Sequence, residues 1–186
     1  MNYQNLTLKT KRLELHPLTM EYAHEVYDIL KKHPEIGYYL PFNEPKTQKD
    51  TEDFIQYTQK KRQEKKGMWW VVLFQKMVIG VVGFDVIREK EQKWKFYNAD
   101  IGYWLNPEYH RQGIMYEVVQ KVILWAFQEL KLQKVYANQV AENKASEGLL
   151  KKVGFQFVGK RKKHFFYENK WWDYNLWELI RKDDKK

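Results

Sequence analysis

The chain has 186 residues, of which 44% are hydrophobic and 17% aromatic, which is enough apolar surface for one domain with a full core or for two very small ones. Its formal net charge of +9 favours anionic partners such as nucleotide cofactors, RNA or acidic protein segments. It contains no cysteine, which excludes disulfides, thiolate metal sites and an acyl-cysteine intermediate.

The longest apolar runs, 68–74 and 77–84, are far shorter than the roughly 20 residues that a membrane helix needs. Residues 1–12 contain no apolar h-region, so no secretory signal is expected. Together with the lack of cysteine, these features predict a cytoplasmic protein with no membrane association. We expect one domain over 1–180 and a charged tail at 181–186.

Hydrophobic periodicity in the first half of the chain predicts a strand, two helices and a hairpin. Thr19 is expected to cap the first helix, and Gln75 and Lys76 form a tight turn between two buried strands. In chain order, the predicted elements are a strand at 12–18, a helix that includes 22–30, a loop at 33–45, a surface helix at 47–66 and strands at 68–74 and 77–87.

The second half alternates strands with helices before it closes on two long strands. In chain order, we expect a charged loop at 88–95, a strand at 96–105, helices at 115–130 and 143–153 around a strand at 134–140, and two antiparallel strands joined at 168–170. Strands joined through helices predict a partly parallel sheet covered by helices, and the hairpins make the remainder antiparallel. The fold class is therefore α/β (α+β).

Residues 107–114 lie between a predicted strand and the first turn of a predicted helix. The first amides of a helix lack internal partners and lie at the positive end of its dipole. Gly113 permits a close bend around a phosphate, and the Arg111 side chain can add a charged donor. The same residues also fit an ordinary connection with an exposed basic side chain, so this loop alone leaves both interpretations open.

A second segment, 141–155, contains Asn143 at a helix start, Ser146 three residues later and Gly154-Phe155 at the helix exit. The order of loop, helix, strand, Asn-x-x-Ser helix and Gly-Phe resembles the GNAT superfamily of acetyl-CoA-dependent N-acetyltransferases. It is most similar to the Rim-type branch, which includes ribosomal-protein N-terminal acetyltransferases. The resemblance also includes residues 10–18 and 171–177, so it covers nearly the whole chain.

The resemblance implies a GNAT fold, with a mixed, mostly antiparallel sheet of about seven strands flanked by four helices. It also implies acetyl-CoA as co-substrate. The strand end would pair with the pantetheine arm, Asn143 would hydrogen-bond that arm, and Ser146 would lie near the thioester sulfur. Read from the residues alone, Asn143 and Ser146 are a helix cap and a first-turn residue. The implied cofactor-binding residues are Tyr103, Trp104, Leu105, His110, Arg111, Gln112, Gly113, Ile114, Met115, Asn143 and Ser146.

The loop departs from the family pattern at three positions. His110 stands where Gln or Arg is usual, Arg111 often corresponds to a glycine, and Met115 replaces a small residue. A left-handed backbone at a non-glycine residue such as Arg111 costs on the order of 1 kcal/mol. A phosphate contact from the Arg111 side chain would offset this strain.

Asp100 is the candidate general base, because related enzymes often carry a Glu there; it could equally orient a loop or pair with a basic neighbour. Leu150 occupies the position of the family's tyrosine acid, so Ser146 or a water would take over that role. A backbone amide near Leu105 could stabilise the oxyanion. Glu117 and His164 are weaker candidates, being typical of a helix first turn and of a strand.

Two further segments have alternative readings. Residues 38–42 are largely aromatic, and they either line the acceptor pocket or cap the core. Residues 159–166 carry four consecutive basic side chains, which could contact phosphates but also suit a solvated strand edge. The five histidines show no metal-ligand spacing, so no metal is expected.

The sequence therefore predicts an N-acetyltransferase that transfers acetyl directly to a primary amine. A protein N-terminal α-amine has a pKa of about 7.7–8.0 against about 10.4 for lysine, so it needs less help to become neutral. The alternatives are a small-molecule amine (an amino acid, aminoglycoside or polyamine) or a non-catalytic RNA- or ribosome-associated module of the same fold. The expected partners are acetyl-CoA, the acceptor and the ribosome, and the protein is a monomer or a homodimer.

Overall fold

The computed structural model describes residues 6–40, 47–91 and 94–182, with only the backbone given at 89–91 and 94–96. One mixed sheet runs through it in the order β1-β2-β3-β4-β5-β6-β8-β7, and among these described strands only β5 and β6 are parallel neighbours. The strands are β1 (Leu8–Lys9), β2 (Leu13–Pro17), β3 (Met68–Phe74), β4 (Met77–Glu91), β5 (Trp94–Leu105), β6 (Lys134–Val140), β7 (Gln156–Tyr167) and β8 (Lys170–Ile180).

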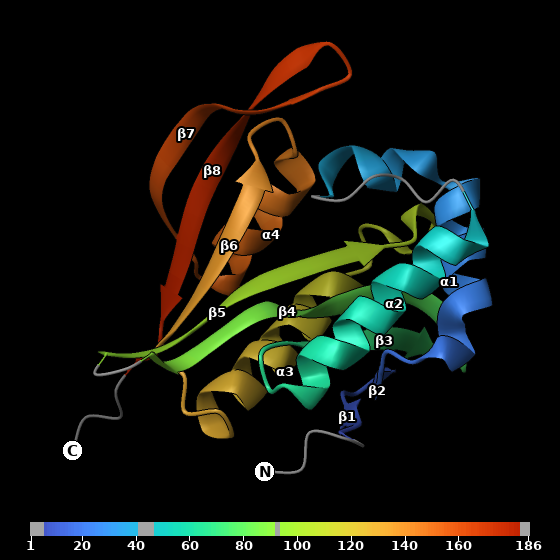
Figure 1. The fold of residues 1–186 in the computed structure, drawn as a ribbon, viewed down its shortest axis with the longest axis horizontal. Helices are drawn as coiled ribbons and strands as arrows, with labels where there is room; N and C mark the ends of the chain where they lie inside the picture. Colours follow the sequence, from blue (N-terminus) through green and yellow to red (C-terminus); the bar gives the residue numbers. More distant parts are fainter. Residues whose placement is uncertain (1–5, 41–46, 92–93, 183–186) are drawn as a thin grey trace.

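Helices cover both faces of the sheet (Figure 1). The α-helices of the described chain are α1 (Ala23–Lys32), α2 (Gln48–Gln63), α3 (Ile114–Gln128) and α4 (Lys144–Val153), with short 3-10 helices η1 (Met20–Tyr22), η2 (Pro34–Tyr39) and η3 (Pro107–Tyr109). Helices α1 and α2 lie on one face, and α3 and α4 on the other. The predicted fold class is confirmed, with one strand more than expected, because β1 is too short to show a period.

The core consists of two apolar clusters, one on each face of the sheet. On the α3 face, the Trp125 ring meets the Trp70 ring edge-on with centroids 5.1 Å apart, and Val118 is fully buried. On the α1–α2 face, Val26 and Ile55 anchor the two helices. Each such side chain contributes roughly 1.5–3 kcal/mol when fully buried. No helix within the described ranges has both the length and the apolar character of a membrane span.

Three local predictions differ from the structure, and the first is the loop expected at 33–45, in which residues 34–39 form η2. The Thr19 side chain makes no capping bond, and η1 intervenes before α1 begins at Ala23. The described part of the charged loop predicted at 88–95 is strand instead: β4 continues to Glu91, β5 begins at Trp94, and residues 92–93 lie outside the described residues.

Strand β5 carries different side chains to the two faces of the sheet. Tyr103 and Leu105 pack on the α3 face, whereas Trp104 packs on the α1–α2 face. Alternation along a strand places Asp100 and Gly102 on the Trp104 side. Gly102 pairs with Gly83 of β4, and a Cβ on Gly83 would lie 2.4 Å from the Trp69 ring. The two glycines therefore let the Trp69 indole lie flat across β4 and β5.

Strands β5 and β6 separate beyond their parallel pairing. The register runs from Asn98 opposite Lys134 to Ile101 opposite Ala137, and then ends. The last residues of β5 continue in one direction while β6 turns away toward β8 (Figure 1). The carboxyl ends of these two strands therefore form an open wedge in the middle of the sheet, and this wedge positions the site described next.

Candidate active site

The loop after β5 uses its first amides internally. Asn106 caps η3 with its side-chain oxygen, 3.0 Å from the Glu108 amide. The amide of Tyr109 donates to the Asn106 carbonyl at 2.9 Å, and that of His110 donates to the Pro107 carbonyl at 3.0 Å. These two N–H groups are therefore satisfied within the 3-10 turn.

The next five amides, those of residues 111–115, have no acceptor in the described part of the chain. Gly113 is the N-cap of the 15-residue helix α3, with φ 72° and ψ 7°, and Arg111 before it has φ 59°. Successive amides around such left-handed residues form a concavity that attracts anions, and the helix dipole adds to its positive potential. Residues 111–115 can thus hold a doubly charged phosphate group, with the exposed Arg111 side chain nearby.

The His110 side chain faces the preceding strand. Its Nε2 lies 3.0 Å from the Leu105 carbonyl oxygen. The His110 side chain therefore links the loop to the end of β5, and this nitrogen would have to leave the Leu105 carbonyl to make the predicted contact with the cofactor. Nothing in the sequence pattern indicated the contact with Leu105.

Arg12 fixes the loop from the other end of the chain. Its Nε donates to Glu117 Oε2 at 2.8 Å, its amide donates to Glu117 Oε1 at 3.2 Å, and its Nη1 donates to the Gln112 carbonyl at 3.2 Å. Partial burial would raise the pKa of Glu117, but hydrogen bonds from Thr10 and Arg12 outweigh it and lower that pKa. Glu117 thus holds the start of α3 rather than facing the wedge. Sequence reasoning missed Arg12, because the two partners are 105 positions apart.

The Leu105 amide points into the wedge. Gly80 and Leu105 are opposite each other in the β4–β5 pair, and the Asn106 amide donates to the Ile79 carbonyl at 2.8 Å. In an antiparallel ladder this bond identifies Gly80 and Leu105 as the non-hydrogen-bonded pair, so the Leu105 N–H is directed away from β4. It points toward the side of β6, where the parallel register has already ended.

Asn143 and Ser146 lie beside this wedge at the start of α4. The Asn143 side-chain oxygen accepts a hydrogen bond from the Ser146 amide at 3.0 Å, so Asn143 acts as the N-cap. The Ser146 hydroxyl lies 2.9 Å from the Tyr103 hydroxyl of β5. Burial raises the pKa of Tyr103 to about 12, while the hydrogen bond with Ser146 acts in the opposite direction. From the sequence, Tyr103 was expected to contact the cofactor through its backbone, and this side-chain contact was not predicted.

Asp100 lies on the α1–α2 face of the sheet, one residue before the last β5–β6 pair. Its carboxylate is 25% exposed and accepts a hydrogen bond from Arg88 Nη1 at 2.7 Å, and the same nitrogen contacts Asn98 Oδ1 at 3.2 Å. The carboxylate is therefore paired with a basic neighbour and still reachable from solvent. His164, the other weak base candidate, lies on β7 with its ring 4.9 Å from that of Tyr174.

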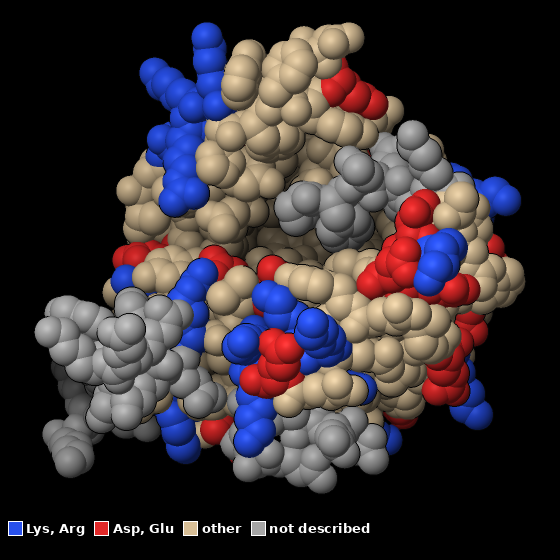
Figure 2. All heavy atoms as spheres, in the orientation of Figure 1, with Lys and Arg blue, Asp and Glu red and all other residues tan. Residues whose placement is uncertain are grey.

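The surface is hollowed between the β7–β8 hairpin and the side that carries η2 (Figure 2). Tyr38 and Tyr39 are 42% and 40% exposed at the end of η2, and Leu40 packs on the α1–α2 cluster. Residues 41–42, which complete the predicted aromatic segment, lie outside the described residues. The exposed tyrosine rings are thus available to line an acceptor path.

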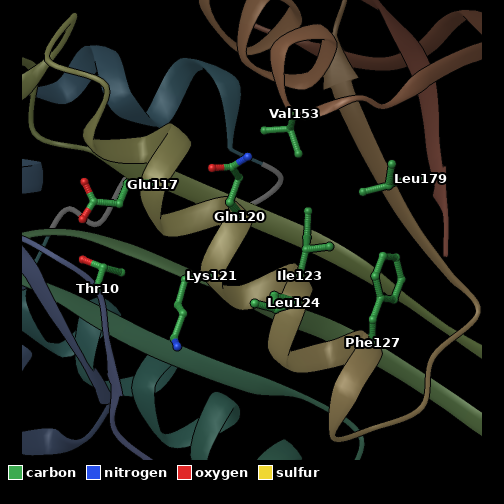
Figure 3. Close-up of a pocket in the computed structure, with 9 residues that line it drawn as sticks. All are labelled: Thr10, Glu117, Gln120, Lys121, Ile123, Leu124, Phe127, Val153 and Leu179. Carbon is green, nitrogen blue, oxygen red and sulfur yellow. The ribbon is translucent and has the colours of Figure 1, made fainter. Parts of the chain in front are cut away.

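A separate shallow groove lies on the outer face of α3 (Figure 3). Ile123, Leu124 and Phe127 of α3 face Val153 of α4 and Leu179 of β8 there. Its wall is apolar at this end, and Asp100 and Ser146 are not among its residues. The candidate site is therefore the wedge with its anion loop, and not this groove.

Comparison with known proteins gives a consistent result. A family model described as Acetyltransferase (GNAT) domain matches residues 12–156. The uncharacterized N-acetyltransferase YoaA of Bacillus subtilis (strain 168) is 28% identical over 176 residues, which span 94% of this chain and 96% of YoaA. The [ribosomal protein uS5]-alanine N-acetyltransferase of Escherichia coli (strain K12) is 27% identical over 110 residues, 59% of this chain and 54% of that enzyme.

The fold is also similar to that of a solved structure. It is RimL, a ribosomal L7/L12 alpha-N-protein acetyltransferase in complex with coenzyme A, and it aligns with a TM-score of 0.86 at 19% identity. The alignment covers 94% of this chain and 98% of that one. At this identity the likeness shows that the two chains share a fold.

Proposed function

The chain belongs to the GNAT acetyltransferase family, and on that premise we propose that it transfers the acetyl group of acetyl-CoA to a protein N-terminal α-amine. The observation that carries the cofactor half of this proposal is the row of amides at residues 111–115, which have no acceptor among the described residues and lie beside the wedge between β5 and β6. RimL, which shares the fold, is described in complex with coenzyme A, and this supports the same assignment.

Each part of the wedge has a role in the proposed binding. The amides of residues 111–115 and the Arg111 side chain hold the diphosphate. The Tyr103–Leu105 backbone pairs with the pantetheine arm as an added strand, since among the described strands its pairing with β6 ends at Ile101. The Asn143 side chain, which already caps α4, lies on the opposite wall of the wedge.

The chemistry proposed for the site is direct attack of the amine on the thioester carbonyl. The Leu105 amide points where it can donate to the developing oxyanion. Asp100 accepts the proton that the amine loses, either directly or through a water. The Ser146 hydroxyl stabilises the departing sulfur.

The acceptor is assigned from the pKa of the amine and from the acceptors of similar proteins. An α-amine with a pKa of about 7.7–8.0 is partly neutral near pH 7.5, so one partly exposed carboxylate is a sufficient base. Two of the similar proteins are described as acting on ribosomal proteins, one on uS5 and one on the α-amine of L7/L12. We extend this to a ribosomal-protein acceptor and a cytoplasmic location, with residues 1–180 acting as one domain.

Binding of cofactor fragments tests the loop assignment. Calorimetry with acetyl-CoA and with acetyl-pantetheine, which lacks the diphosphate, should show at least about 100-fold weaker binding of the fragment, because hydrogen bonds to charged groups contribute about 1.5–3 kcal/mol each. The dephospho form of acetyl-CoA keeps the diphosphate and should lose much less affinity. Equal affinities for acetyl-CoA and acetyl-pantetheine would contradict the assignment.

A paired peptide assay tests the acceptor. A peptide with a free N-terminal alanine and an internal lysine should gain one acetyl group at its α-amine, as located by mass spectrometry. The same peptide with a blocked N-terminus is the control and should stay unmodified. Acetylation of the blocked peptide, or faster turnover of a free amino acid or polyamine, would move the assignment to a lysine or a small-molecule amine.

A further inference from the structure

We propose that Tyr103 is a positioning residue for this reaction: its hydroxyl donates a hydrogen bond to the Ser146 oxygen and so directs the Ser146 proton toward the leaving sulfur. The inference rests on the proposed function, because it requires a thioester in the wedge beside Ser146. It assigns a task to the side chain of a residue that enters the proposed function only through its backbone.

The two hydroxyls are brought together by separate elements. Tyr103 lies near the end of β5 and Ser146 in the first turn of α4, and their oxygens are 2.9 Å apart. The Ser146 backbone is fixed in turn by the bond from its amide to Asn143. In the described part of the chain, neither hydroxyl has a further side-chain partner.

The direction of the hydrogen bond follows from acidity, because a phenol hydroxyl is a stronger donor than an alkyl hydroxyl. Two hydroxyls that share one hydrogen bond place one proton between them, and the other proton must find a different acceptor. Tyr103 packs against the α3-side core, where no other acceptor reaches it among the described residues. If Ser146 were the donor, the more acidic phenol would accept from the less acidic alkyl hydroxyl, which is the weaker pairing. Tyr103 is therefore the donor, and the Ser146 hydroxyl, half-buried like Tyr103, keeps its own proton for the wedge.

This arrangement suits the step in which the thioester breaks. The amine nitrogen forms a bond to the carbonyl carbon, the carbon–sulfur bond breaks, and its electron pair passes to sulfur, while the proton lost by the amine goes to Asp100 or water. A thiol with a pKa of about 8.5 leaves as a thiolate, so it needs a hydrogen-bond donor rather than a strong acid. Donation from Tyr103 polarises the Ser146 hydroxyl and strengthens its bond to that thiolate.

The thiol of bound CoA reports this contact without any acceptor or turnover. The chain has no cysteine, so the difference in thiolate absorbance between the complexes with CoA and with desulfo-CoA belongs to CoA alone. We expect Ser146→Ala to raise the pKa of the bound thiol by about one unit and Tyr103→Phe by about half a unit, a tenfold and a threefold change in the ionisation constant. The double variant should equal Ser146→Ala, because Tyr103 acts through Ser146. With an identified acceptor, Tyr103→Phe should lower kcat and leave KM for acetyl-CoA unchanged.

Tyr57→Phe is the matched control, since it removes a tyrosine hydroxyl that is 3.1 Å from Asp85 on the surface of α2. It should leave the bound thiol unchanged. An unchanged thiol pKa in Tyr103→Phe would overturn the inference, and so would a double variant whose effect is the sum of the two single effects. In either case, binding of CoA would still support the cofactor part of the proposed function. Failure of the unmodified protein to bind CoA would overturn both.

Discussion

At the scale of single residues, Asp100 combines an observed contact with a proposed one. Its carboxylate accepts a hydrogen bond from Arg88 Nη1 at 2.7 Å, and we propose that it also takes up the proton of the attacking amine. Protonation removes the charge that holds Arg88, and the bond from Arg88 Nη1 to Asn98 then remains. The two roles can be separated by substitution. An amide oxygen can still accept the hydrogen bond from Arg88, but only the carboxylate can take up the proton of the amine.

Asp100→Asn is expected to lower kcat by about 100-fold, the usual effect of losing a general base, without changing affinity for acetyl-CoA. Arg88→Gln breaks the same ion pair but leaves the carboxylate, so it should keep most of the activity. Steady-state kinetics and acetyl-CoA calorimetry on the two variants make the comparison. Equal losses in both would assign Asp100 a purely structural role.

At the scale of elements, the start of β2 is fastened to the start of α3. Arg12 contacts both Glu117 and the Gln112 carbonyl, and its Nη2 would lie 3.9 Å from a Cβ on Gly113. The positive-φ turn that exposes the loop amides is thus supported by a neighbouring strand. Loosening this contact should affect both stability and anion binding.

Glu117→Gln is expected to lower the free energy of unfolding by about 0.5–1 kcal/mol at pH 7, since the pair is only partly buried. The folded-state pKa of Glu117 is lowered, so its stabilising contribution is present above the unfolded value of about 4.3 and is lost as pH falls through the folded pKa. Urea denaturation of both proteins between neutral and acidic pH should therefore show a difference that shrinks on acidification.

Asp53→Asn provides the control for this element. It breaks the pair between Lys49 and Asp53 along α2, in which both side chains are more than half exposed. Its effect on unfolding should be smaller, and acetyl-CoA affinity should change only in Glu117→Gln. A pH-independent difference for Glu117→Gln would show that shape, and not charge, explains its effect.

At the scale of the whole molecule, one cluster of positive side chains lies on the β7–β8 hairpin. Lys and Arg side chains gather along its outer edge (Figure 2), and residues 160–163 are all exposed. Lys160 is partly balanced by Asp173 at 3.6 Å. With a net charge of +9, this surface should attract acidic acceptors before they reach the hollow.

Lys162→Glu is expected to lower kcat/KM for a peptide with acidic residues after its N-terminus, and to leave a neutral peptide unaffected. The loss should fade as ionic strength rises, because charges separated by more than about 10 Å are screened at 0.1 M salt. Lys131→Glu makes the same change in net charge in the turn before β6 and is the control. Equal losses in both variants would point to net charge rather than to the hairpin.

The sequence by itself determined most of the local elements and, through the order of its motifs, the resemblance to the family. Residues 134–140 form the predicted strand, and α4 begins after Asn143 as predicted, because periodicity and capping depend on neighbours in the chain. Only the tertiary structure decided which side chains meet: Arg12 with Glu117, Arg88 with Asp100, and Tyr103 with Ser146. Those pairs depend on strand order, on register and on the separation of β5 from β6, and these are set by packing across the whole sheet.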